Sequence, residues 1–272
     1  MRKFLLIALL PALLLGCKDR DTTGATGTTE SSTESTSAPA EGNQDTGTAT
    51  ASDSAEGAAS AQGANSQASA PASSATPPAA GVPQGYTRVP DLSEQPKRDF
   101  KEEPDFQLEE GQDYAAVVNT NRGQMVIDLH EDVPTTVNSF VWLARHKFYD
   151  GLAFHRVIEG FVVQGGDPNT LKNERNAWGT GGPGYSIPLE IRRKYNFDEK
   201  GVLGMARSQD PNSGGSQFYI TLAPAPNLDG QYTVFGKVVQ GLDVLDQIKK
   251  YEAPAEGEVD RMQSVYIVTK NK

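Results

Sequence analysis

The pattern of apolar and polar positions changes at Asp113. Beyond it, short apolar runs separated by turn residues predict β-strands, beginning with a pair at residues 114–119 and 124–129. An Asn-Arg-Gly segment joins this pair, a spacing typical of a hairpin. We expect further strands at residues 153–158, 161–165, 202–206, 217–222, 233–239 and 263–269.

Two helices are expected among these strands. The first begins with Asp132 or Val133 near its N-cap and Pro134 in its first turn, and it ends near Lys147. Its apolar face has helical spacing and consists of Val137, Phe140, Val141 and Ala144. The second covers residues 241–250, with Leu242, Leu245 and Ile248 on one side. Many strands and two helices far apart in sequence predict a closed β-barrel with a helix capping each end.

The pattern before the barrel predicts an exported, lipid-anchored protein. Two basic residues precede an apolar run at 4–15 that is too short to span a bilayer and is typical of a signal peptide, residues 1–16. The run ends in Leu-Leu-Gly before Cys17, the only cysteine, which resembles the lipobox of bacterial lipoproteins. We therefore expect Cys17 to be lipidated and to anchor the protein in the cell envelope, facing the periplasm or the exterior. Lys18 rather than aspartate after it favours the outer membrane of a diderm host.

Residues 17–85 are expected to be a disordered tether, because they hold almost no large apolar side chains to offset the entropy of ordering. Residues 86–112 mix prolines, charges and a few apolar residues, and two interpretations remain open: an extended arm lying against the domain, or continued disorder. The folded domain would then be residues 113–272.

Charge and motif composition narrow the function. Most of the net charge of −10 lies before Asp113, and neither part has the basic stripe of a nucleic-acid binder. A G-x-G-x-x-G match at 179–184 lacks a preceding strand and a following helix, so it does not predict nucleotide binding. Ser216 lacks the closing glycine of a nucleophile elbow. The three scattered histidines predict no metal site, and His155 is expected to be a hydrogen-bonded core residue.

Arg156 is the unusual residue, because it lies among apolar side chains at 154–162, where a charge is costly to desolvate. In a strand, Val162 and Gln164 point to one face, and so do Gln217 and Tyr219. If the strand of Val162 and Gln164 lies beside the strand of Gln217 and Tyr219, the two strands form an apolar surface. The side-chain amides and the guanidinium of Arg156 then border that surface. Such a site can bind an apolar group and place a strong donor beside it.

Four segments resemble the signature of the cyclophilins. They are FHRVIEGFVVQGGD at 154–167, VLGMA at 202–206, GSQFYI at 215–220 and LDGQYTVFG at 228–236, and the resemblance covers residues 114–268 in one order. It implies a mainly β fold, a closed eight-stranded antiparallel barrel with two capping α-helices. It also implies peptidyl-prolyl cis-trans isomerase activity that needs no cofactor.

Carried over by position, the resemblance makes Arg156 the catalytic arginine. The substrate-binding residues that it implies are Phe161, Val162, Tyr219 and Leu228 around the proline, Gln164 and Gln217 on the peptide backbone, Gly179, Ala206 and Arg207 in the adjoining groove, and Tyr232. Asn227 and Tyr232 differ from residues common in the family, which puts cyclosporin sensitivity in doubt. Residues 169–178 are longer than the family's common loop.

Three hypotheses follow for the function. The first is a lipid-anchored, monomeric prolyl isomerase that acts on proline-containing exported polypeptides. The second is a cyclophilin-like holdase or scaffold of the envelope, for which proline binding matters and turnover does not. The third is a structural lipoprotein whose tether is its function.

Overall fold

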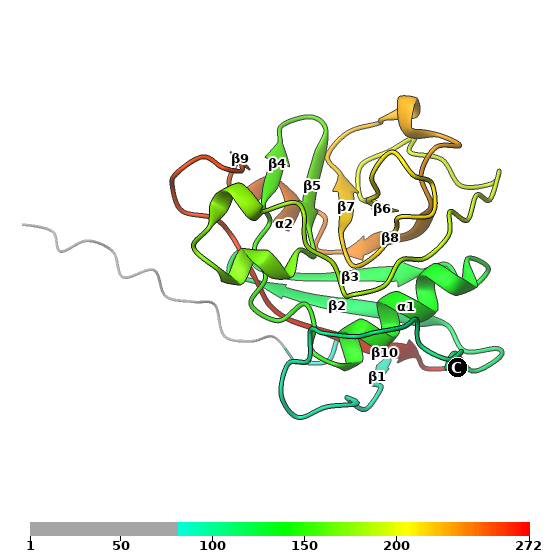
Figure 1. The fold of residues 1–272 in the computed structure, drawn as a ribbon. Coiled ribbons are helices and arrows are strands. Elements are labelled where there is room, and N and C mark those ends of the chain that lie inside the picture. The colour runs from blue at the N-terminus through cyan, green and yellow to red at the C-terminus, as the bar shows by residue number, and fades with distance from the viewer. Residues whose placement is uncertain (1–80) are drawn as a thin grey trace, which may run out of the picture. The chain divides into compact units, whose positions relative to one another are not determined.

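The expected strands form one antiparallel sheet in the computed structural model, which describes residues 81–272 (Figure 1). The expected signal peptide, Cys17 and the tether up to residue 80 lie outside the described residues. The strands are β1 (Tyr86–Arg88), β2 (Tyr114–Thr120), β3 (Gly123–Leu129), β4 (Arg156–Ile158), β5 (Val162–Gly165), β6 (Val202–Met205), β7 (Phe218–Thr221), β8 (Val234–Gln240), β9 (Tyr251–Glu252) and β10 (Met262–Lys270).

The prediction of a closed barrel of eight strands is wrong in its details. The described sheet has ten strands in the order β1-β10-β2-β3-β8-β6-β7-β5-β4-β9, and its end strands β1 and β9 do not pair with each other. A single bridge, Ala153 to Arg261, links the segments that precede β4 and β10. The two additional strands have three and two residues, which is too short to show an apolar period of two.

Helix α1 (Pro134–Arg145) follows the expected pattern and packs on β10. Val133 is its N-cap and Pro134 its first residue, as predicted. Its expected apolar face, Val137, Phe140, Val141 and Ala144, is buried in the main core. Within residues 81–272, no helix is both long enough and apolar enough to cross a membrane.

The second helix is much shorter than predicted. Helix α2 covers only Val244–Gln247, and Ile248 already has extended backbone angles. Leu245 and Ile248 are buried, but Leu242 is 40% exposed, so the predicted apolar face is only partly correct. The chain leaves the helix because Lys249 donates its backbone N–H to Asp260 at 2.7 Å and Tyr251 pairs with β4. Strand pairing therefore overrides the helical spacing of the apolar residues.

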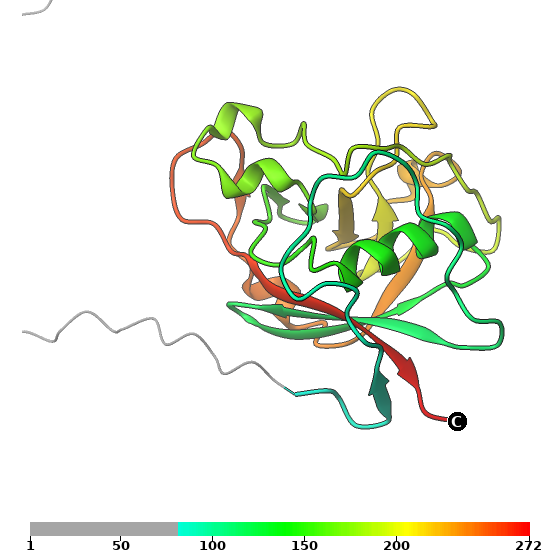
Figure 2. The same ribbon diagram turned by 60° about the horizontal axis from the view of Figure 1, so that its bottom comes forward.

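The segment before β2 lies against the domain. Strand β1 pairs with the C-terminal end of β10, and the following chain passes around α1 (Figure 2). The backbone N–H groups of Leu92 and Lys97 donate to carbonyls at the C-terminal end of α1. Phe100 is only 6% exposed, and its ring centroid lies 4.2 Å from that of Trp142. The arm is thus part of the packed structure from β1 onward.

Candidate active site

Every residue that the sequence assigned to the site lines one of two adjoining hollows. The first is a pocket of about 310 Å³. It is lined by Arg156, Phe161, Val162, Gln164, Ala206, Arg207, Tyr219, Leu228 and Tyr232. The pairing of β4 with β5 sets Arg156 opposite Gln164, and the pairing of β5 with β7 sets Gln164 opposite Tyr219. Neighbouring strands thus bring segments about 60 residues apart in sequence into one wall.

The floor of this pocket is a small apolar cluster separate from the main core. Its members are Val162, Phe197, Val202, Tyr219, Ala225, Leu228 and Val234, with Phe161, Tyr195, Ala206 and Tyr232 packed against them. The ring centroid of Phe197 lies 5.6 Å from that of Tyr219, so the phenylalanine packs against the tyrosine ring. Phe197 could not be predicted at this place, because it lies in a mostly polar loop with no apolar period.

Arg156 is held at the edge of the pocket by two neighbours. Its Nε atom lies 3.2 Å from Oε1 of Glu252, the residue that β9 places directly opposite it. Its Cζ atom lies 5.7 Å from the centroid of the Phe161 ring. Within the described residues no hydrogen bond is recorded from either Nη atom of Arg156. The guanidinium therefore keeps its two outer nitrogens for a ligand.

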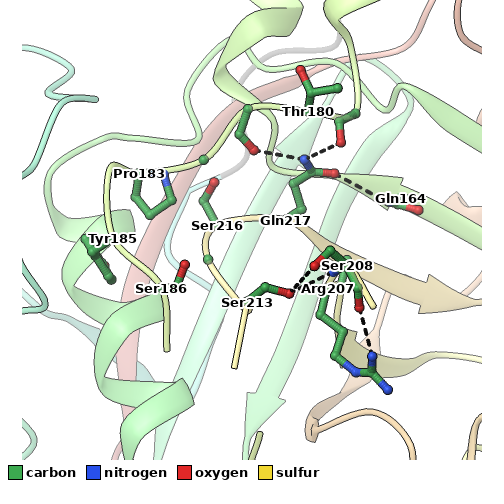
Figure 3. A pocket seen from close by; sticks show the side chains of 15 residues that line it. Gln164, Thr180, Pro183, Tyr185, Ser186, Arg207, Ser208, Ser213, Ser216 and Gln217 are labelled. Atoms are coloured by element: carbon green, nitrogen blue, oxygen red, sulfur yellow. Dashed lines mark hydrogen bonds between the residues drawn. The ribbon is translucent and has the colours of Figure 1, made fainter. Parts of the chain in front are cut away.

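Gln217 fixes the wall between the pocket and the second hollow. Its Nε2 atom donates to the carbonyls of Gly179 and Gly181, both at 2.9 Å, and its Oε1 accepts from Nε2 of Gln164 at 3.1 Å (Figure 3). Both amide hydrogens of Gln217 are therefore used inside the protein. Gln164 keeps its own oxygen and one N–H for a bound peptide.

The second hollow is a groove of about 470 Å³ that shares Gln164, Ala206 and Arg207 with the pocket. Its other lining residues are small or neutral: Gly179, Thr180, Gly181, Gly182, Pro183, Tyr185, Ser186, Ser208, Ser213, Gly215, Ser216 and Gln217. Burial raises the pKa of Tyr185 to about 12, so this side chain also stays neutral. Apart from Arg207, the groove thus presents only neutral groups.

Arg207 lies between the pocket and the groove and lines both. Its guanidinium stacks on Tyr232, with Cζ 4.7 Å from the ring centroid, and donates to the backbone carbonyl of Gln231 from Nε at 3.0 Å. The Tyr232 ring meets Tyr219 edge-on at 5.8 Å between centroids. Asn227 does not line either hollow; its carbonyl accepts from the side chain of Gln231 at 2.7 Å.

His155 is buried as predicted, but the expectation of a hydrogen bond is wrong. Neither ring nitrogen has a partner within residues 81–272. The reason lies in its neighbours: Gln217 spends its amide hydrogens on two glycine carbonyls, and Asp167 accepts from the backbone of Asn169 and Gly179. Burial lowers the pKa of His155, an effect that the nearby Asp167 carboxylate partly offsets. A neutral imidazole results.

The arrangement limits the chemistry of the site. Ser216 donates its hydroxyl to the Gly166 carbonyl at 2.7 Å, so it is not paired with a base. No group of three or more His, Cys, Asp or Glu side chains within residues 81–272 could hold a metal ion. What the pocket offers is an apolar surface, amide groups and one guanidinium with free donors.

Part of this chain is similar to known proteins in sequence and in fold. Residues 115–271 match the family described as cyclophilin type peptidyl-prolyl cis-trans isomerase/CLD. A peptidyl-prolyl cis-trans isomerase of Helicobacter pylori is 44% identical over 138 residues, which are 50% of this chain and 80% of the relative. Peptidyl-prolyl cis-trans isomerase B of Bacillus subtilis is 45% identical over 130 residues, 48% of this chain and 85% of the relative. A crystal structure of a Cryptosporidium parvum cyclophilin type isomerase aligns with a TM-score of 0.50 and 28% identity, covering 57% of this chain and 97% of that one.

The fold, the pocket and these relatives define the class of the protein. The chain belongs to the cyclophilin-type peptidyl-prolyl cis-trans isomerases. Its activity is accordingly the interconversion of the cis and trans forms of X-Pro peptide bonds.

Proposed function

We propose that Arg156 is the catalytic group and that the pocket beside it holds the ring of the substrate proline. The observation that carries this assignment is that Arg156, with both Nη atoms unbonded within the described residues, lines the same pocket as Phe161, Tyr219 and Leu228. A pyrrolidine ring fits such an apolar pocket. The arrangement therefore presents donors next to the one amide that the enzyme must rotate.

The chemistry follows from amide resonance. Rotation about an X-Pro bond breaks the partial double bond, at a barrier of about 18–20 kcal/mol, and unaided takes roughly tens to hundreds of seconds. In the twisted transition state the proline nitrogen regains its lone pair. A donor aimed at that nitrogen binds the transition state better than the planar ground state, which is the requirement for catalysis.

Arginine suits this task because its fork of donors stays charged at every working pH. The Glu252 contact at Nε leaves the Nη atoms to reach the proline carbonyl and nitrogen. Gln164 binds the peptide backbone through its free amide groups, while Gln217 keeps the Gly179–Gly181 wall in place. The remaining residues of the peptide lie along the groove bordered by Ala206 and Arg207.

The test is the replacement of Arg156 in the full chain. Because a hydrogen bond to a charged group contributes about 1.5–3 kcal/mol, Arg156→Ala should lower kcat/KM about 10- to 100-fold without lowering the Tm. Arg156→Lys keeps the charge but loses the planar fork of donors. Its kcat/KM should lie between those of wild type and Arg156→Ala. Exchange NMR of a proline peptide measures the rates. Unchanged turnover by Arg156→Ala would remove the assignment.

The cellular setting is a second part of the proposal, supported by the amino-acid sequence of residues 1–85. The protein is exported, lipidated at Cys17 and held on a tether in the cell envelope, in the outer membrane of a diderm host. There it acts as a monomer on newly exported proline-containing polypeptides. Cys17→Ala should move the protein from the membrane fraction to the soluble envelope fraction, because acyl chains provide the attachment.

A complementation experiment separates catalysis from binding. If Arg156→Ala fails to restore a deletion strain while wild type succeeds, turnover is the function. Full restoration by Arg156→Ala would favour a holdase or scaffold.

A further inference from the structure

The loop between β5 and β6 touches the segment that follows β9. It contains two short 3₁₀ helices, η1 (Pro168–Leu171) and η2 (Arg175–Ala177). Arg175 reaches out of η2 with three hydrogen bonds. It donates from Nη1 to Tyr251 Oη at 2.7 Å and to the Ala255 carbonyl at 3.0 Å, and from Nη2 to the Gly257 carbonyl at 2.8 Å. One side chain thus spans the turn from residue 251 to 257.

Aromatic contacts hold the same arginine in place. Its Cζ atom lies 5.0 Å from the centroid of Trp178 and 5.6 Å from that of Tyr251. Trp178 is buried and donates its indole N–H to the Lys172 carbonyl at 3.1 Å. Since Arg175 is mostly buried and bonded through both Nη atoms, its conformation is fixed.

Strand β9 depends on this support. It has only two residues, lies at the end of the sheet and, among residues 81–272, pairs with no strand but β4. One of its residues, Tyr251, is a direct partner of Arg175. The other, Glu252, lies opposite Arg156 and accepts from its Nε atom. A continuous set of contacts therefore runs from the loop to the pocket.

We propose that Arg175 and Glu252 are positioning residues for Arg156: the loop holds β9, and β9 holds the Nε side of the guanidinium so that its Nη atoms point to the substrate. The proposal rests on the catalytic role of Arg156. It gives a task to residues 169–178. The consequence is that turnover depends on a side chain that lines neither the pocket nor the groove.

The exposed position of Glu252 indicates that it acts on Arg156 through its accepting oxygen and not through its charge. Its side chain is 62% exposed, so water and salt screen its charge. An accepting oxygen at that place, however, still selects one conformation of the arginine. Glu252→Gln keeps an oxygen and loses the charge, whereas Glu252→Ala loses both.

The first experiment compares these two variants in the full chain. Glu252→Ala should lower kcat about two- to fivefold with little change in KM, and Glu252→Gln should stay within about twofold of wild type. The ¹H–¹⁵N resonance of the Arg156 Nε–H group should shift in Glu252→Ala. Equal losses in both variants would mean that the charge matters and would overturn the positioning role, as would no loss in either.

The second experiment tests the loop. Arg175→Met should lower kcat about three- to tenfold and move the same Nε–H resonance, and Arg175→Lys should recover part of the rate. Arg88→Met is the matched control, since Arg88 also stacks on a tyrosine (Cζ to Tyr266 centroid, 4.4 Å) and pairs with Asp91 at 3.1 Å, but on β1. It should leave kcat and the resonance unchanged. If Arg175→Met does not fold, the decision rests on Glu252→Ala.

A double variant distinguishes the catalytic role of Arg156 from the positioning role of Arg175. In the Arg156→Ala background, Arg175→Met should cause no further loss of kcat, because the group that it positions is gone. If Arg156→Ala is fully active, the catalytic assignment fails. If Arg156→Ala is impaired but Arg175→Met and Glu252→Ala are not, or if the losses simply add, only the positioning role fails.

Discussion

The ring of Tyr219 lies directly against the backbone of Gly204. The two residues are opposite each other in the β6–β7 pairing, and a Cβ atom at position 204 would lie 2.5 Å from Cζ of the tyrosine. Glycine at 204 therefore sets the depth at which Tyr219 forms the pocket wall. The Tyr219 hydroxyl is buried without a partner within residues 81–272, and burial raises the pKa of this phenol.

Gly204→Ala should consequently reduce activity by moving Tyr219 into the space for proline. We expect a higher KM and a loss of about 1–3 kcal/mol in the free energy of unfolding, the usual cost of overpacking. Peptide titration and urea unfolding measure the two effects. Gly81→Ala is the control, because a Cβ there meets nothing within 4 Å, and it should behave like wild type. A normal KM for Gly204→Ala would show that the tyrosine can move elsewhere.

Gln217→Glu should be more harmful than its similar shape suggests. The replacement places a carboxylate oxygen where Nε2 now donates to the carbonyls of Gly179 and Gly181. Repulsion and two lost hydrogen bonds should cost about 1–3 kcal/mol of stability and lower kcat/KM at neutral pH. Gln247 is exposed, so Gln247→Glu is the control for the effect of an added negative charge on stability. Equal stability of the two variants would argue against a structural role for the Gln217 amide.

Phe100→Ala should destabilise the domain without changing turnover. Its ring contacts Trp142, His146 and Phe148, so its loss should lower the free energy of unfolding by about 3 kcal/mol. Phe106 lies on the same arm but is 64% exposed, and Phe106→Ala should have almost no effect. Urea unfolding distinguishes the two variants. Equal stabilities would mean that the arm contributes nothing to the fold in solution.

Stability should fall as the pH is lowered from about 7 to about 5. Burial lowers the pKa of His130, His146 and His155, so the folded state takes up protons less readily than the unfolded state, whose histidines titrate near 6.5. The neutral histidine rings therefore contribute their full stabilisation above the unfolded-state pKa of about 6.5. This stabilisation is lost as the pH falls through the lower pKa values of the histidines in the folded state.

His155→Gln isolates the contribution of the most enclosed ring. The variant should show a smaller loss of unfolding free energy between pH 7 and pH 5 than wild type, measured by urea unfolding at each pH. An identical slope would indicate that His155 does not contribute to the acid sensitivity.

Much of the fold follows from local pattern. All eight expected strands are present, and Gly160, with φ of +66°, makes the turn between β4 and β5. What the pattern could not show depends on tertiary contacts. The pairing of β9 with β4 shortens the predicted second helix, and β1 forms only because β10 offers a free edge. Neither segment carries a period of its own, and these two segments form the end strands of the sheet.

The pocket could be assembled from sequence because its residues belong to long, distinctive segments. The supporting residues could not. Glu252 and Arg175 lie 96 and 19 residues from Arg156 in segments without a recognisable pattern. Only the folded chain places Arg175 against the strand of Glu252, and Glu252 against Arg156. For Phe197 and Gly204, likewise, the important quantity is the distance to Tyr219, which no local sequence encodes.

The attachment of the arm determines where mechanical load enters the domain. A pull on the chain before Gly85 would act first on the hydrogen bonds between β1 and β10 and then on β2. Strands β4, β5 and β7, which carry the pocket, are far from these strands in the order of the sheet. A force on the N-terminal segment would thus be borne first by β1 and β10, whereas the strands of the pocket lie toward the other end of the strand order.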